Sequence, residues 1–495
     1  MFRMSSYVRS RPGVLPYQGL KVGYCTDIKE NMYKCSPPLQ INPLSASPSD
    51  QAAQPLSQCS HKKLHSASSF PLLMMEPEVD KDNNHLIRFA DFPDNRVWTT
   101  KGMVPKEVND AICIGSSHGW LAYISRRDCS IFLWNPFITI ASPDPPRLIR
   151  LPPIDTLPHV TVVPLGESGI SRKSDDWHCT STTSNILRSA YEDEFSADFN
   201  FKVEYQDTVL GLKGRGDYII SPNELSIYFI RKIVLSSAPT SDDCVVVALP
   251  HRQHNPSIAF CKPGDKSWTF VEPVKEFSRI EDVIHFQDHL FYTVSSGGTP
   301  IVAYDLADLS SPKSYFLEAS FNFQPLSSTC QSITSWSVAK HYLVESLGNL
   351  LWVRRFVSSH MDDMANMLYD EEVEFPRRTT GFDVYRLDFA RNTWEFTLLG
   401  DQALFLGINQ SLSLPARECG FKANNIYFTD DSRSILYDST LYGGYDLGCY
   451  DLEREGRTWS PSHDYKEALP PPIWVMPTMN LVSQPLHITS KSCLL

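Results

Sequence analysis

Ser117 and His118 place a hydroxyl group beside an imidazole, the two groups that a hydrolase uses as nucleophile and general base. Adjacent residues of a β-strand point to opposite faces of the sheet, so these two side chains cannot readily form a nucleophile–base pair. We therefore interpret the pair as a turn whose polar groups hold the edge of a sheet. The sequence predicts no catalytic residue here.

Two pairs of neighbouring carboxylates, Asp362-Asp363 and Asp430-Asp431, could supply oxygen ligands to a hard cation. Neither pair has the alternating spacing of a calcium-binding loop. Asp430 follows an apolar run, where a carboxylate more commonly accepts backbone N–H groups at a turn. We therefore predict no metal ligand in this chain.

Three further motifs are weak. The glycines of 211–216 resemble a phosphate-binding loop, but their order is wrong and no helix follows, so we expect a flexible turn. Arg215-Gly216-Asp217 spells an adhesion tripeptide, and Asn409-Gln410-Ser411 spells a glycosylation site. Both would need a secretory signal, and the chain begins without an apolar signal segment. No cofactor-binding residue is predicted.

Tryptophans recur in the expected strand units, and they could form either an aromatic binding surface or the packing between sheets. Because they recur at strand positions, we interpret them as packing residues. The set is Trp120, Trp134, Trp268, Trp394 and Trp459, with Trp352 and Trp474 also expected in the core.

Composition narrows the class of protein. The chain has 495 residues, 42% hydrophobic and 12% aromatic residues, and a formal net charge of −12. That charge argues against a nucleic-acid binder that relies on phosphate contacts. The 12 cysteines are scattered without a C-x-x-C pair, which favours reduced thiols in an intracellular compartment over disulfides or zinc. No apolar run reaches the roughly 18 residues of a membrane span, so we expect a soluble protein.

We expect residues 1–69 to be disordered, because prolines and serines recur there without a hydrophobic period. Basic residues occur at the start and no acidic residue precedes Asp27, as in an organellar transit peptide. The alternative is an ordinary disordered tail. The sequence therefore favours a mitochondrion or chloroplast, with the cytoplasm or nucleus as the alternative.

From residue 70 onward, short apolar runs alternate with polar turns. A hairpin, a linker, a strand ending in Tyr-x-Leu or Tyr-Asp-Leu, a turn and often a tryptophan recur about every 50 to 75 residues. This exceeds the ~40–50 residues of compact blades, and insertions would explain the difference.

Residues 225–235 are expected to form a strand. The stretches near 164–200 and 357–376 are expected to be insertions, and the first of them a long exposed loop. We predict an all-β fold, a single β-propeller of at least five blades, with six or seven expected, over residues 70–478. Residues 479–495 are expected to be a flexible tail.

Several segments of the chain together resemble the sequence pattern of a known family. They are Gly115 to Leu121, Asn135-Pro136-Phe137, Leu151-Pro152-Pro153, Leu399 to Gly407, and Asn425 to Asp431. They resemble a plant family long called domain of unknown function 295 and now described as the KIB-type β-propeller. The resemblance covers about residues 70–478. Leu399 to Gly407 and Ile426 to Asp431 together are its most specific part.

The resemblance implies two kinds of protein. Some family members carry an N-terminal F-box and are similar to substrate receptors of SCF-type ubiquitin ligases, whereas others lack it and are similar to an organelle-targeted branch. An F-box would be a helical module beginning near Leu-Pro-x-Asp/Glu-Leu, and residues 1–70 contain no such motif. A truncated or mispredicted N-terminus would explain the same observation.

The sequence therefore predicts a non-enzymatic propeller that binds an unidentified protein partner at its rim, of the organelle-targeted branch. The first alternative is a substrate-recognition subunit of an SCF-type ubiquitin ligase, which would bind a Skp1-like protein if an F-box is supplied. The second alternative is a propeller hydrolase, which would need convergent carboxylates or histidines at the channel mouth. We predict no cofactor, no nucleic-acid partner and no membrane partner.

Overall fold

The computed structural model divides the chain into two units, Met1–Lys63 and Leu64–Leu495. All described residues belong to the second unit: 70–75, 78–79, 81, 85–91, 96–99, 104–138, 148–165, 198–209, 212–250, 257–271, 280–298, 301–321, 337–358, 378–431, 446–459, 472–477 and 487–489. The expected disordered head and most of the two expected insertions lie outside them, as does most of the expected tail.

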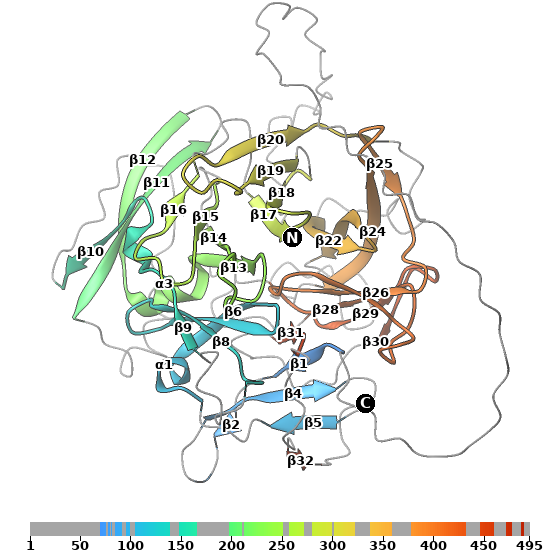
Figure 1. The fold of residues 1–495 in the computed structure, drawn as a ribbon, viewed down its shortest axis with the longest axis horizontal. Helices are drawn as coiled ribbons and strands as arrows, with labels where there is room; N and C mark the ends of the chain where they lie inside the picture. The colour runs from blue at the N-terminus through green and yellow to red at the C-terminus, as the bar shows by residue number, and fades with distance from the viewer. Residues whose placement is uncertain are drawn as a thin grey trace, which may run out of the picture. The chain divides into compact units, whose positions relative to one another are not determined.

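Six sheets of the described residues form the blades of a propeller, which confirms the predicted all-β fold (Figure 1). Blade 1 contains β6 (Ala111–Ser117), β7 (Trp120–Ser125), β8 (Ile131–Trp134) and β9 (Leu148–Arg150). Blade 2 contains β13 (Ile230–Leu235), β14 (Val246–Pro250), β15 (Ala259–Cys261) and β16 (Thr269–Phe270). Blade 3 contains β17 (Ile280–His285), β18 (Leu290–Ser295), β19 (Ile301–Asp305) and β20 (Lys313–Leu317).

The other three blades each have five strands. Blade 4 contains β22 (Ser337–Ser346), β23 (Asn349–Ser358), β24 (Arg378–Asp388), β25 (Thr393–Phe396) and β21 (Ser320–Phe321). Blade 5 contains β26 (Gln402–Leu406), β27 (Leu412–Pro415), β28 (Asn425–Phe428), β29 (Gly448–Asp451) and β30 (Gly456–Trp459). Blade 6 contains β31 (Ile473–Val475), β1 (Leu72–Met74), β4 (Arg88–Asp91), β5 (Arg96–Thr99) and β32 (His487–Thr489). Six blades lie within the predicted range.

The blades follow one another in a closed ring. The innermost strands contact in the order β6, β13, β17, β22 and β27, and β31 contacts β6. Blades 5 and 6 share a cluster in which the rings of Phe405 and Trp474 lie 5.1 Å apart. Blade 6 combines strands from both ends of the described chain, since β31 pairs antiparallel with β1 and places Trp474 opposite Leu73. β32, within the stretch expected to be a tail, pairs with β5.

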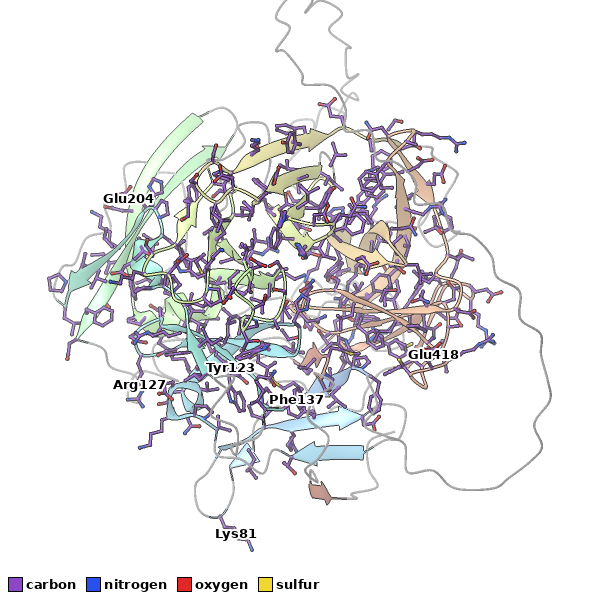
Figure 2. All side chains as sticks on the ribbon, viewed as in Figure 1. Lys81, Tyr123, Arg127, Phe137, Glu204 and Glu418 are labelled. Atoms are coloured by element: carbon purple, nitrogen blue, oxygen red, sulfur yellow. The ribbon has the colours of Figure 1, made fainter. Side chains whose placement is uncertain are left out.

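The second strand of blade 1 shows how a strand between two neighbouring blades buries both of its faces. All six residues of β7 are buried. Trp120, Ala122 and Ile124 enter the cluster shared with blade 2, whereas Leu121 and Tyr123 enter the cluster shared with blade 6. Successive side chains of a strand point to opposite faces, so a sheet between two neighbours must be apolar on both. Tyr123 is labelled in Figure 2, within the crowded side chains of blade 1.

The tryptophans pack between strands, as predicted. Trp120, Trp134, Trp268, Trp352, Trp394 and Trp474 are all buried. Trp394 packs against Trp352 with 5.6 Å between ring centroids. The side chain of Trp459 lies outside the described part of the chain.

The segment expected to be a strand at 225–235 is instead a helix followed by a strand. Helix α3 (Pro222–Tyr228) begins with a capping box, in which Ser221 Oγ accepts from Glu224 N and the Glu224 carboxylate accepts from Ser221 N. Pro222 occupies a first-turn position, where its missing N–H costs nothing. The sequence contains these helix start signals, but the apolar residues that follow them led to the prediction of a strand.

A seventh sheet lies beside blade 1 and flanks the stretch near 164–200, most of which lies outside the described residues. It contains β10 (Val160–Pro164), β11 (Phe199–Val209) and β12 (Leu212–Ile220). The glycine-rich run 211–216 was expected to be a flexible turn, but its residues 212–216 belong to β12, which pairs with β11 along its length. The remaining short elements are β2 (Glu78–Val79), β3 (His85–Leu86), α1 (Lys106–Asn109) and the 3-10 helix η1 (Ile154–Thr156).

One buried ion pair joins the innermost strands of three consecutive blades. Lys232 of β13 bonds to the carboxylate of Asp282 on β17. The same carboxylate accepts from Val283 N at 2.8 Å and from Leu343 N of β22 at 2.9 Å. Burial raises the pKa of Asp282 despite the nearby ammonium group. The pair thus satisfies groups on blades 2, 3 and 4 at once.

Replacement of Trp394 by Ala is expected to lower the free energy of unfolding by about 3–5 kcal/mol, since it leaves a cavity in the core between blades 3 and 4. Denaturant melts measure the loss. Phe396→Ala on the same strand is the control, because Phe396 is exposed. A loss below about 1 kcal/mol for Trp394→Ala would show that this side chain is not part of the core.

Lys232→Met is expected to cost about 3–5 kcal/mol, because it leaves a buried carboxylate without its cation. The double variant Lys232→Met/Asp282→Asn is expected to lose less than the sum of the single losses, with a coupling of at least ~1 kcal/mol. Urea melts of all four proteins complete the cycle. Additivity within about 0.5 kcal/mol would mean that the two groups do not act together.

Candidate functional site

One face of the propeller carries the turns that join the first and second strands of blades 1 to 4. We call this the first-turn face. It includes the turns His118–Gly119, Gln287–His289 and Leu347–Gly348 and the longer loop from Ser236 to Val245 between β13 and β14. Because strands alternate in direction, the turn between the third and fourth strands of a blade lies on the same face. The loops at one end of a rigid scaffold are the usual place for binding residues.

Ser117 is bound into this face. Its Oγ donates to Gln410 Oε1 of blade 5 and accepts from Leu235 N of blade 2 at 3.1 Å. Gln410 N donates to Ser116 O at 2.8 Å. The hydroxyl is therefore engaged with two other blades rather than with His118, whose φ of 49° places it in the turn. The sequence interpretation of a turn held by polar groups describes this arrangement.

Gly115 to Gly119 also fit the Gly-x-Ser-x-Gly pattern of α/β hydrolases. In those enzymes the serine lies on a sharp turn between a strand and a helix, whereas here Ser117 ends β6 and β7 follows. Gly115 has a structural reason, since a Cβ there would lie 3.3 Å from Ile408 O and 3.5 Å from Ile233 O. This glycine lets the backbones of three blades approach closely.

Aromatic rings connect blades 3 and 4 on the first-turn face. Phe389, in the turn between β24 and β25, stacks on Phe286 with 6.2 Å between centroids and an interplanar angle of 10°. It also contacts Tyr292 edge-on at 6.4 Å. Phe389 is nevertheless 39% exposed. The stacking holds an apolar side chain at the surface in a fixed position.

Leu347 is the most exposed large apolar residue among the described ones, with 74% of its surface accessible. It forms a two-residue turn with Gly348, at φ values of 52° and 74°. Both values are positive, as in the type I′ hairpin turn, which favours Asn-Gly. A leucine in this left-handed conformation is strained by crowding at its Cβ. The chain therefore holds a strained, exposed leucine at the tip of a rigid hairpin.

A cluster of charges joins blades 4 and 5 away from these turns. Arg355 is 1% exposed and donates to Asp446 Oδ2 at 2.8 Å and to Thr429 O at 2.8 Å. Asp431 bonds to Lys340 and accepts from Tyr342 Oη at 2.8 Å. Burial would raise the pKa of Asp431, but the charges of Lys340 and Arg355 outweigh it and hold the pKa well below its usual range.

The sequence suggested Asp430-Asp431 only as metal ligands or turn residues. It did not show that Lys340 and Arg355 are the cationic partners of Asp431. The available signal was a basic residue inside an apolar strand, such as Arg355 in β23. The described residues contain no group of three or more His, Cys, Asp or Glu side chains arranged to hold a metal ion. Asp362 and Asp363 lie outside them.

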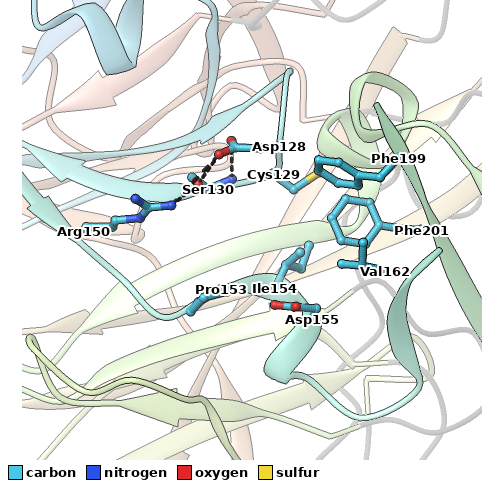
Figure 3. A pocket seen from close by; sticks show the side chains of 10 residues that line it. All are labelled: Asp128, Cys129, Ser130, Arg150, Pro153, Ile154, Asp155, Val162, Phe199 and Phe201. Atoms are coloured by element: carbon cyan, nitrogen blue, oxygen red, sulfur yellow. Dashed lines mark hydrogen bonds and ion pairs between the residues drawn. The ribbon is translucent and has the colours of Figure 1, made fainter. Parts of the chain in front are cut away.

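A cavity of about 180 Å³ lies between blade 1 and the seventh sheet (Figure 3). Phe199, Phe201 and Val162 form its apolar side, and a hydrogen-bonded set of polar groups forms the other. In that set Ser130 Oγ donates to Asp128 at 2.7 Å and accepts from Arg150 Nη2 at 2.7 Å. These polar groups satisfy one another, so the cavity presents no activated nucleophile.

The remaining motifs have structural places. Asn409 is fully buried and its amide donates to Phe405 O and Gln410 O, so the glycosylation sequence is enclosed in blade 5. Arg215-Gly216-Asp217 lies within β12. No helix of the described part of the chain is long and apolar enough to cross a membrane.

Comparison with known proteins gives three findings. A family model described as the KIB1-4 β-propeller matches residues 89–451. An Arabidopsis thaliana protein named a putative F-box protein is 26% identical over 269 residues, which are 54% of this chain and 65% of the relative, so the match covers less than two thirds of its length. Among solved structures, the S. cerevisiae core factor matches at 11% identity and a TM-score of 0.21, over 67% of this chain and 50% of that one. A TM-score of 0.21 does not establish a shared fold.

Asp431→Asn is expected to lower stability at pH 7, and its deficit relative to the unmodified protein should shrink below about pH 4. The depressed folded-state pKa means that ionised Asp431 stabilises the fold above the unfolded-state pKa, and that this stabilisation is lost as the pH falls toward the folded-state value. Urea melts from pH 7 to pH 3 measure both proteins. A deficit that stays constant over this range would show that the carboxylate charge contributes nothing.

Proposed function

Because the chain belongs to the KIB1-4 β-propeller family, we propose that it is a non-enzymatic protein-binding module whose partner docks on the first-turn face. Leu347 carries this proposal. A bulky residue in a left-handed turn costs stability that Asn would not cost, and Leu347 is 74% exposed, so burial offsets little of this cost. Contact with a partner would bury the exposed leucine and recover the lost free energy.

The surroundings of Leu347 suit a docking surface. Its hairpin is fixed by Gly348 N donating to Glu345 Oε1 at 2.7 Å and by Asn349 Nδ2 donating to Leu347 O at 3.0 Å. Phe389 lies on the same face and is held by its stack on Phe286. Side chains that are already ordered lose little entropy on binding. Apolar anchors on rigid turns are typical of the few residues that dominate an interface.

The proposal that the chain is not an enzyme is supported by the state of Ser117, whose hydroxyl is bound to Gln410 and Leu235. The hydrolase alternative would place convergent carboxylates or histidines at a cavity with an activated nucleophile. An assay of the purified chain against generic ester and glycoside substrates tests this point. Turnover of such a substrate by the purified chain would overturn it, whether or not Ser117→Ala abolishes that turnover.

A more specific function is a substrate-recognition subunit of an SCF-type ubiquitin ligase. It is supported by the name of the Arabidopsis relative alone. Co-purification of the full chain with a Skp1-like protein would support this role. If a known F-box protein co-purifies with it in the same experiment and this chain does not, direct recruitment is excluded.

We further propose an organellar location from the acid-poor start of the chain. A fluorescent fusion whose organellar signal persists without residues 1–60 would contradict a transit role for that segment.

The partner-docking proposal predicts opposite effects of one substitution on stability and on binding. Leu347→Asn is expected to stabilise the fold by about 0.5–1 kcal/mol, because Asn-Gly suits this turn. It should also weaken capture of the partner from plant-cell extract at least tenfold, a loss of ~1.4 kcal/mol or more. Quantitative mass spectrometry of affinity-purified material measures capture, and urea melts measure stability.

Leu165→Asp is the matched control, because Leu165 is 59% exposed but follows β10 of the seventh sheet. It should capture the same protein as the unmodified chain. Phe389→Asp should lose it. If Leu347→Asn and Phe389→Asp both recover the partner in full, the first-turn face is not the docking surface.

A further inference from the structure

We propose that a cavity between blades 2 and 3 on the first-turn face receives an arginine or lysine side chain of the protein partner. This inference rests on the proposed function and names the chemistry of the contact. The cavity has a volume of about 150 Å³ and lies between the β13–β14 loop and the β17–β18 turn. It is distinct from the cavity beside the seventh sheet.

The size of the cavity selects a single side chain. Sites for drug-sized ligands measure roughly 300–1,000 Å³, so this cavity is too small for such a molecule. It equals about five times the volume of one water molecule in the liquid. The side chain of arginine has seven non-hydrogen atoms and needs space of this order. One long side chain that enters from the surface therefore fits better than a cofactor.

The floor of the cavity is apolar and preformed. Val245, Phe291 and Leu306 line it, and all three are buried members of the core cluster between blades 2 and 3. Lysine and arginine have long aliphatic stems that pack on apolar surface while the charged end remains among polar groups. A floor of this kind suits the stem of a basic side chain and gives a short polar side chain nothing to contact.

The rim of the cavity is acidic. Asp243 and Asp288 line it and are exposed, and the lining residues include no lysine or arginine. A cation entering the cavity would meet two carboxylates, and an anion would be repelled by them. Hydrogen bonds between a guanidinium or ammonium group and a carboxylate are about twice as strong as those between neutral groups. The charges therefore select a basic guest over an acidic one.

Two further groups in the cavity offer acceptors. His285 Nε2 donates to Asp288 O at 2.7 Å, so in the neutral ring Nδ1 remains an acceptor. Burial lowers the pKa of His285, which keeps the ring neutral near pH 7. The hydroxyl oxygen of Ser237 is buried with no hydrogen-bond partner among the described residues. A guest with several N–H donors would satisfy groups that the cavity leaves available.

The test uses N-acetyl-arginine methylamide as the probe and N-acetyl-citrulline methylamide as its uncharged analogue of the same shape. The full chain is labelled with ¹³C at histidine Cε1, and the signals of His285 and His289 are followed by NMR during titration. The arginine probe should shift both signals with a Kd of about 1–10 mM, as expected for one isolated side chain. The citrulline probe should bind at least tenfold more weakly.

Asp243→Asn and Asp288→Asn should each weaken the arginine probe about tenfold without a change in fold. Asn is well tolerated at the φ of 44° found at Asp288. Glu418→Gln is the control, because Figure 2 shows this exposed carboxylate on blade 5, away from the cavity. It should leave the titration unchanged. With a captured partner in hand, the two Asn variants should weaken its binding as well.

Equal affinity for the two probes, full affinity in both Asn variants, or no shift at a probe concentration tenfold above the expected Kd would each overturn the assignment. The result is independent of the docking test. An arginine-dependent shift stands even if Leu347→Asn leaves partner capture intact, and an absent shift overturns the cavity assignment even if the Leu347 result supports docking.

Discussion

A closed ring of sheets must return its last strand to its first blade, because an open ring exposes a sheet edge and two apolar faces to water. In this protein the three residues of β31 meet that constraint. They pair with β1, contact β6 and bury Trp474 completely. Ser116 Oγ donates to Trp474 O at 2.5 Å, which connects the closing strand to blade 1. This short contact covers the facing sides of blades 1 and 6, as each other pair of neighbouring blades covers its own facing sides.

Polar groups that bridge neighbouring blades complement the apolar packing between them. Lys232–Asp282 joins blades 2, 3 and 4, Arg355 with Asp431 and Asp446 joins blades 4 and 5, and Ser117 with Gln410 joins blades 1 and 5. Buried charges add little net stability compared with apolar residues of the same shape. What they do provide is a fixed register between neighbours, because each one has a specific partner. Turns that project from blades held in this way keep their positions, as a docking surface requires.

The sequence was sufficient for the fold class, because alternating apolar strands and recurring tryptophans have few other architectures. It was less informative where local signals competed. The capping box at Ser221 was hidden by the apolar residues of α3, and β12 was hidden by its glycines. The candidate site was harder still. Leu347 looks ordinary until its φ is known, and the cavity between blades 2 and 3 combines Asp243 with Asp288, residues that only the ring brings together. Contacts between distant segments leave no pattern in a sequence read without relatives.

The pairing of β1 with β31 also affects folding during synthesis on the ribosome. Ribosomes add about 5–20 residues per second, so β1 leaves the ribosome tens of seconds before its partner strand exists. Throughout that interval the inner edge of β1 and the apolar residues Leu73 and Met74 have no covering strand. The nascent chain therefore carries an unpaired strand edge until β31 is made, and this edge could pair with another chain in that interval. The edge of β1 that pairs with β31 in the folded chain therefore stays open to other strands until residue 473 is made.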